Sequence, residues 1–149
     1  MLSFIKRIFS NPTADWPRSV NDPVLGELRH SDDADWWEGH TTVGSRTIGF
    51  KIGGEGKPDE RLLTHAHDIV RALPQFEQLV SAFLADEARH VKYLASFGDE
   101  ICKLSIDDVC LFWPDRPDDG MIYFKGPNEL RLWRCDYVAR KPLGLGFDS

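Results

Sequence analysis

Apolar and polar residues alternate near both ends of the chain, whereas the middle carries apolar residues at helical spacing. The clearest alternation covers 36–43 and 46–52, which flank a Gly-Ser pair at 44–45. A two-residue loop that begins with glycine favours a type II′ hairpin turn. The register of that turn gives the hairpin one common buried face, made of Trp37, Ile48, Phe50 and Ile52. Trp36 and His40 then lie on its polar face, either partly covered by another segment or available to a partner.

The middle of the chain is predicted to form two helices, the second covering about 75–93. The first has apolar residues at helical spacing from Leu62 onward and is expected to end at Pro74, which cannot continue a helix. His65 and His67 on this helix lie about 200° apart around the axis, because each residue turns the helix by about 100°. They cannot face one metal ion from a regular helix, and we interpret both as solvated side chains at the helix edge.

Glu87 lies near the centre of the apolar stripe of the second helix, and His90 follows three positions later on the same side. A carboxylate in apolar surroundings must be paired, protonated or functional. Glu87 therefore forms a structural pair, or is exposed by a kink, or belongs with His90 to a pocket for a small ligand. The Glu-x-x-His spacing also occurs in di-iron bundles, but these need two such pairs on four long helices. No metal site is predicted.

The end of the chain returns to strand patterns. Strands are expected at 107–113, 121–125 and 130–138, followed by a last strand in which Leu143, Leu145 and Phe147 share a face opposite Gly144 and Gly146. With the hairpin and a short strand at 25–28, this order predicts the α+β class. A largely antiparallel sheet, formed from N- and C-terminal strands, would pack against the two central helices. We assign 25–149 to one domain of this kind.

The first 24 residues are predicted to lie outside that domain. Residues 1–9 have apolar side chains at helical spacing around Lys6 and Arg7, which predicts a short amphipathic segment. This segment is too short to cross a bilayer and is interrupted by charge, so neither a transmembrane segment nor a signal peptide is predicted. Docking on the domain, on a partner or on a membrane surface stays open for it. Residues 10–24 contain three prolines and are interpreted as an irregular linker.

Composition narrows the classes of function. Of the 149 residues, 42% are hydrophobic and 28% are charged, which is typical of a folded globular protein. The formal net charge of −6 disfavours nucleic-acid binding, because acidic side chains repel phosphate groups. The 3 cysteines have neither disulfide nor zinc spacing. We interpret them as small buried apolar side chains in a reducing compartment, which favours the cytoplasm.

Two turns between the expected strands are strongly acidic. The first contains Asp32, Asp33 and Asp35, and the second contains Asp115, Asp118 and Asp119. The second turn does not have the spacing of an EF-hand calcium loop. We predict that both turns, together with Trp36 and His40, form a surface for a protein partner that carries basic groups.

The sequence contains no motif that is typical of a catalytic centre. The glycine-rich segment 53–58 has a proline where a P-loop needs serine or threonine, and no GxSxG sequence occurs. No catalytic residue and no cofactor is therefore predicted.

Three parts of the chain carry a resemblance to known proteins: Leu25-Gly26-x-Leu28, Trp36-Trp37-x-Gly39, and the end from Trp133 to Leu145-Gly146-Phe147-Asp148-Ser149. With the two-helix middle between them, they resemble small bacterial α+β proteins of uncharacterised families. Some of these are immunity proteins of polymorphic toxins. The resemblance implies a cytoplasmic, non-enzymatic role and assigns no catalytic residue.

The main prediction is therefore a non-enzymatic, immunity-like module that binds a protein through an acidic surface. The alternative is a small-ligand-binding protein or enzyme with a pocket around Glu87 and His90. A purely structural role, or self-association into a homo-oligomer, also stays open at this point.

Overall fold

Eight strands form one sheet in the computed structural model, which describes residues 17–148, and their order in the sheet is their order in the chain. They are β1 (Ser19–Asp22), β2 (Gly26–His30), β3 (Trp36–Val43), β4 (Arg46–Gly53), β5 (Ser105–Leu111), β6 (Gly120–Lys125), β7 (Leu132–Val138) and β8 (Lys141–Asp148). Every neighbouring pair is antiparallel except β4 and β5, which are parallel. The predicted α+β class and the largely antiparallel sheet are confirmed.

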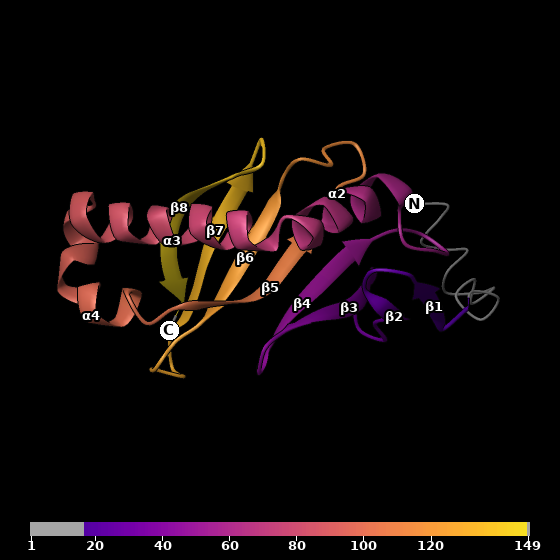
Figure 1. Cartoon of the computed structure of the whole chain (residues 1–149), viewed down its shortest axis with the longest axis horizontal. Coiled ribbons are helices and arrows are strands. Elements are labelled where there is room, and N and C mark those ends of the chain that lie inside the picture. The colour runs from indigo at the N-terminus through magenta and orange to yellow at the C-terminus, as the bar shows by residue number, and fades with distance from the viewer. Residues whose placement is uncertain (1–16, 149) are drawn as a thin grey trace.

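A helical segment connects the two parallel strands. It consists of α2 (Glu60–Arg71), α3 (Leu73–His90), the 3-10 helix η2 (Lys92–Phe97) and α4 (Gly98–Ile101). Such a long connection is needed because the chain must return to the end of the sheet at which β4 began. Figure 1 shows α2 and α3 running across one face of the sheet, where α2 contacts β4 and α3 contacts β8. Within residues 17–148, no helix is long and apolar enough to cross a membrane.

The boundary between the two long helices differs from the prediction. α2 ends at Arg71, and Pro74 lies in the first turn of α3 instead of ending the helix before it. Proline is favoured in a first turn because the backbone N–H groups there have no partner inside the helix. The start of α2 is fixed by Asp59, whose carboxylate accepts hydrogen bonds from two backbone N–H groups of the first turn.

The predicted hairpin register is confirmed between β3 and β4. Val43 is paired with Arg46, and Glu38 is paired with Lys51. The predicted buried face packs against α2 in one core cluster that includes Trp37, Ile48, Phe50, Ile52, Leu62, Ala66 and Ile69. Gly39 leaves room on this face, because a β-carbon there would lie 2.4 Å from Cδ2 of Leu28. The register thus sends one face of the hairpin into the core and the other face away from the helices.

Part of the predicted N-terminal linker, residues 10–24, is a strand instead. Residues 19–22 form β1, which is paired with β2 along its whole length. The carboxylate of Asp22 accepts hydrogen bonds from the backbone N–H groups of Val24 (3.0 Å) and Leu25 (2.8 Å), and so holds the turn into β2. Pro23 follows β1 directly, at a position where no ladder hydrogen bond is lost. The predicted amphipathic segment lies outside the described residues.

Candidate functional site

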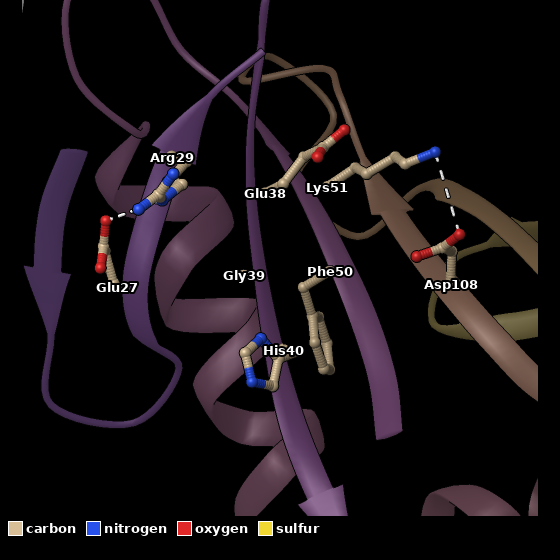
Figure 2. Close-up of a pocket in the computed structure, with 8 residues that line it drawn as sticks. All are labelled: Glu27, Arg29, Glu38, Gly39, His40, Phe50, Lys51 and Asp108. Atoms are coloured by element: carbon tan, nitrogen blue, oxygen red, sulfur yellow. Dashed lines mark hydrogen bonds and ion pairs between the residues drawn. The ribbon is translucent and has the colours of Figure 1, made fainter. Parts of the chain in front are cut away.

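The face of the sheet that points away from the helices carries the polar side chains of β2 to β5, and we call it the open face. Figure 2 views this face, with helices behind the strands. Trp37 is fully buried on the opposite face, whereas its neighbour Trp36 is half-buried and Glu38 and His40 are exposed. The predicted placement of Trp36 and His40 on the polar face follows from the confirmed register.

An aromatic stack lies at one end of the open face and consists of Trp36, Phe112 and Trp113. The rings of Trp36 and Phe112 are stacked with centroids 5.1 Å apart, and Trp113 contacts Phe112 edge-on at 6.1 Å. Two cations extend the stack: Lys51 Nζ lies 5.3 Å from the Trp36 ring, and the Arg116 guanidinium lies 4.6 Å from the Trp113 ring. All three aromatic side chains are half-buried, so each keeps some surface for a partner.

The two acidic turns meet beside this stack because of the strand register. Trp36, which follows the first turn, is paired with Gly53 at the end of β4. The preceding residue of β4, Ile52, is paired with Leu111 at the end of β5, from which the second turn leaves. Both turns therefore leave the same end of the sheet, although about 80 residues of chain separate them. Most of the predicted partner surface is brought together there.

Not all six carboxylates of these turns are equally available. Asp32, Asp33 and Asp115 are exposed, and within residues 17–148 their carboxylates form no hydrogen bond or ion pair. Asp118 instead accepts a hydrogen bond from Nε of Arg140 at 2.7 Å, which lowers the pKa of its carboxyl. Asp119 accepts a hydrogen bond from the backbone N–H at the tip of the β7–β8 turn. Asp118 and Asp119 thus stabilise the fold through these hydrogen bonds. Asp35 is also exposed and lies next to Trp36.

A groove of about 530 Å³ crosses the open face next to the stack (Figure 2). Its lining comes from four adjacent strands and consists of Glu27, Arg29, Glu38, Gly39, His40, Phe50, Lys51 and Asp108. The register places Arg29 opposite Glu38, and Glu38 opposite Lys51, so charges of alternating sign cross the sheet. Sequence reasoning placed His40 on this face but missed the groove, because its β5 wall depends on a parallel pairing that no local pattern reveals.

Asp108 forms the β5 wall of the groove and has unusual surroundings. Its Oδ2 lies 3.8 Å from Nζ of Lys51, and Figure 2 shows the two side chains pointing toward each other. Its Oδ1 fills the space left by Gly49 on β4, since a β-carbon at that glycine would lie 2.0 Å away. Burial raises the pKa of the Asp108 carboxyl above its ordinary value, although Lys51 opposes the shift. This carboxylate is therefore partly removed from water, and Lys51 is the cation that contacts it.

Glu87 and His90 form separate contacts instead of a shared one. Oε1 of Glu87 accepts a hydrogen bond from the backbone N–H of Leu145 at 2.9 Å, and the Tyr93 hydroxyl donates to the carbonyl of the same residue at 3.2 Å. These two side chains cover polar groups of β8, the edge strand. His90 is exposed and lies 2.9 Å from Oδ1 of Asp86. A ligand pocket around Glu87 and His90 stays a prediction.

Substitution of Glu87 distinguishes the edge contact from a shared site. Glu87→Ala is expected to lower the free energy of unfolding by about 1–2 kcal/mol, because the N–H of Leu145 loses its acceptor. Glu87→Gln should recover most of this loss, since an amide oxygen can accept the same hydrogen bond. Urea denaturation measures both variants. His90→Ala is the control and should stay within about 0.5 kcal/mol of the wild type; an equal loss there would contradict separate roles.

The structure corrects the interpretation of His65 and His67 as solvated side chains, because both are covered by other parts of the chain. His65 is buried, with Nδ1 bonded to the Pro117 carbonyl and Nε2 lying 3.1 Å from the Tyr137 hydroxyl. His67 is mostly covered, and its Nε2 lies 2.9 Å from both carboxylate oxygens of Asp22. A helical wheel places each side chain correctly around the axis, but it cannot show which loop or turn covers it.

The Asp22 carboxyl responds to this contact. Its burial alone would raise its pKa, but hydrogen bonds from the backbone N–H groups of Leu25 and Val24 and from His67 outweigh burial and lower the pKa. In the described residues, no group of three or more histidine, cysteine, aspartate or glutamate side chains could hold a metal ion. The two histidines therefore act as structural hydrogen-bonding groups that join α2 to the sheet and to its connecting turns.

The cysteines differ from the prediction at one position. Cys110 and Cys135 are buried as expected, whereas Cys102 is exposed at the end of α4. Burial raises the pKa of both buried thiols to about 12, so they remain protonated at neutral pH. A protonated thiol is a weak nucleophile, and neither buried cysteine is suited to covalent catalysis.

Comparison with known proteins adds no family to this description. No protein-family model, no curated protein and no solved structure matched the chain.

Proposed function

We propose that the protein is a non-enzymatic protein-binding module whose partner carries a basic surface. The observation that carries the proposal is the meeting of the two acidic turns around the aromatic stack. Half-buried aromatic rings beside unpaired carboxylates have the composition expected of an interface centre with a charged rim. The formal net charge of −6 favours a partner of opposite sign.

The kind of partner follows from the distribution of charge. Among residues 17–148, no cation forms an ion pair with Asp32, Asp33 or Asp115, so a basic partner would gain attraction without first breaking such a pair. Nuclease toxins are basic because they bind nucleic acid, and they suit this surface. An immunity-like role in the cytoplasm, in which the module blocks such a toxin, is the specific form of the proposal. Charge attraction would make capture fast, and the stack would slow dissociation.

Charge reversal at the unpaired carboxylates tests the proposal. We expect the triple change Asp32→Lys, Asp33→Lys and Asp115→Lys to slow association with the partner by about 10- to 100-fold at low ionic strength. At high ionic strength the difference should shrink, because salt screens exposed charges. The partner is first captured with the tagged protein from the native host and identified by mass spectrometry. Rate constants are then measured with both purified proteins by surface plasmon resonance.

The matched control reverses three exposed carboxylates far from the stack: Asp86, Asp99 and Glu129. It changes the net charge by the same amount but leaves the end of the sheet intact. An equal loss of association rate in this control would show that net charge alone is responsible, and the proposed surface would be wrong. Unchanged rates in both triple variants would contradict a charge-steered partner altogether.

A further inference from the structure

Asp108 is the group in the groove whose interactions are least complete. Its side chain is 27% exposed, yet within residues 17–148 its carboxylate accepts no hydrogen bond. The contact with Lys51 is 3.8 Å long, which exceeds hydrogen-bond distance. Carboxylates that are largely removed from water normally accept several hydrogen bonds. This one faces a groove of about 530 Å³ from which a donor can approach.

The charged groups that line the groove leave one carboxylate without a compensating cation. Its lining contains three carboxylates, of Glu27, Glu38 and Asp108, but only two permanent cations, Arg29 and Lys51. Arg29 is already bonded to Glu27 through Nε at 2.8 Å. Lys51 is shared between Asp108 and the ring of Trp36, and it forms no hydrogen bond among the described residues. The groove thus has one negative charge in excess.

Glu38 is held in position for an additional donor. The indole N–H of Trp36 donates to Oε1 of Glu38 at 2.9 Å, and Oε2 accepts no hydrogen bond from residues 17–148. Its cross-strand partner Lys51 lies between it and Asp108 in the row of side chains, as Figure 2 shows. Two carboxylates with free acceptor atoms therefore flank the groove on either side of one loosely held lysine.

We propose that this groove receives an arginine side chain of the protein partner, with Asp108 as its main acceptor and Lys51 displaced toward Trp36. This inference rests on the proposed function, since it names the group by which a basic partner is recognised. A guanidinium group has five donors in a planar fork and can bridge two carboxylates. It is also less strongly hydrated than an ammonium group, which suits a partly dry site. Burial raises the pKa of Asp108, and a bound cation would lower it again.

The test uses Nα-acetyl-arginine amide as the probe and does not need the partner. The isotope-labelled protein is titrated with the probe and followed by amide NMR spectra. We expect saturable shifts centred on Gly49, Lys51 and Asp108, together with a fall in the Asp108 pKa measured from its carboxyl carbon. Nα-acetyl-citrulline amide, which has the same shape without the charge, should produce no such shifts.

Three variants decide between the groove and general charge attraction. Asp108→Asn should weaken probe binding by about tenfold, the usual size of a charged hydrogen bond. Lys51→Gln should tighten binding, because it removes the competing cation. Asp107→Asn is the matched control: it removes the same charge one position away, where the carboxylate contacts Lys125 outside the groove. Its binding should equal that of the wild type, and its spectrum, like those of the other variants, reports whether the fold is intact.

The outcomes separate this inference from the function on which it rests. Shifts that avoid the groove, equal binding of the citrulline probe, or equal weakening by Asp107→Asn would overturn the arginine site. If the site fails while charge reversal at the acidic turns still slows partner association, the protein-binding function stands and only the groove is excluded. If both experiments fail, the function itself is wrong.

Discussion

Replacement of Trp37 by alanine is expected to lower the free energy of unfolding by about 3–5 kcal/mol, the usual effect of removing a large aromatic side chain from a core. The indole is fully buried, its N–H donates to the Gly54 carbonyl at 3.2 Å, and its ring contacts His30 edge-on at 5.0 Å. Alanine would leave a cavity between β3 and α2 that the rigid sheet cannot close. Urea denaturation, monitored by circular dichroism, measures this loss as a lower midpoint urea concentration, while the dependence of the unfolding free energy on urea stays unchanged.

The neighbouring tryptophan provides a matched control. Trp36→Ala changes the same side chain one position earlier, but Trp36 points to the open face and is only half-buried. Its loss should cost about 1 kcal/mol or less. A large loss at Trp36 with a small one at Trp37 would mean that the hairpin register is shifted by one residue. Since Trp36→Ala should leave the fold intact, the same variant also tests whether the aromatic stack slows dissociation of the partner.

Replacement of His65 by leucine is expected to cost about 2–4 kcal/mol at neutral pH. Leucine keeps an apolar side chain in the space, but the Tyr137 hydroxyl and the Pro117 carbonyl both lose their partner. Each buried polar group left without a partner costs about 1–3 kcal/mol. His65→Gln should lose less, because its amide can form one of the two hydrogen bonds. Urea denaturation of the three proteins at pH 7.5 measures the order, and an equal loss in both variants would contradict a hydrogen-bonding role.

The same residue predicts how the stability of the fold depends on pH. Burial lowers the pKa of His65 below its ordinary value of 6.5, which Arg140 favours and the Pro117 carbonyl and Asp118 oppose. Below pH 6.5 the unfolded chain therefore binds a proton that the folded chain does not bind, and the free energy of unfolding falls as pH falls. The slope from this one group is at most about 1.4 kcal/mol per pH unit.

The contribution of His65 is obtained by comparison with His65→Leu, which has no titrating group at this position. Denaturation curves of both proteins between pH 7.5 and pH 5 should show the larger dependence in the wild type. Protonation of the Asp22 carboxylate also lowers the free energy of unfolding as pH falls. This happens only near and below its ordinary carboxyl pKa of 3.8, so Asp22 does not contribute between pH 7.5 and pH 5. A leucine variant with the full pH dependence would place the titrating group elsewhere.

The local parts of this fold were accessible from the sequence because each depends on neighbouring residues. A glycine at the first position of a two-residue loop fixes the register of β3 and β4, and that register alone separates Trp37 from Trp36. The acidic turns were recognised as turns for the same reason. The sequence placed both turns on one predicted surface but did not show how they meet at one end of the sheet, because this depends on the parallel pairing of β4 with β5. The local sequence pattern of a strand does not show which strand it pairs with across a helical connection.

Other differences arise where one residue interrupts a regular pattern. Alternation predicts that Leu143 shares the buried face with Leu145, yet Leu143 is 50% exposed. Gly144 adopts a φ of 70° and lies within a bulge, so that β8 uses one residue more than β7 there. His65 differs from its prediction for another reason, because it is covered by the β5–β6 loop, which comes from a distant part of the chain.

The candidate site was predictable as a surface of acidic and aromatic residues, but the groove with Asp108 was not.

The order of the strands has a consequence for how the chain folds. β1 to β4 are joined only by hairpin connections, and so are β5 to β8, so each half closes short loops at small entropic cost. The only pairing of strands distant in sequence within residues 17–148 is that of β4 with β5, across the segment 54–104. Non-local pairings of this kind slow folding, and we expect the joining of the two halves to set the rate.

The groove spans this same join, because Lys51 belongs to β4 and Asp108 to β5. A ligand that binds there needs both halves in place and cannot bind either half alone. By linkage, its binding free energy would add to the stability of the assembled sheet at its least local contact. The partner would then slow the separation of the two halves as well as occupying the surface.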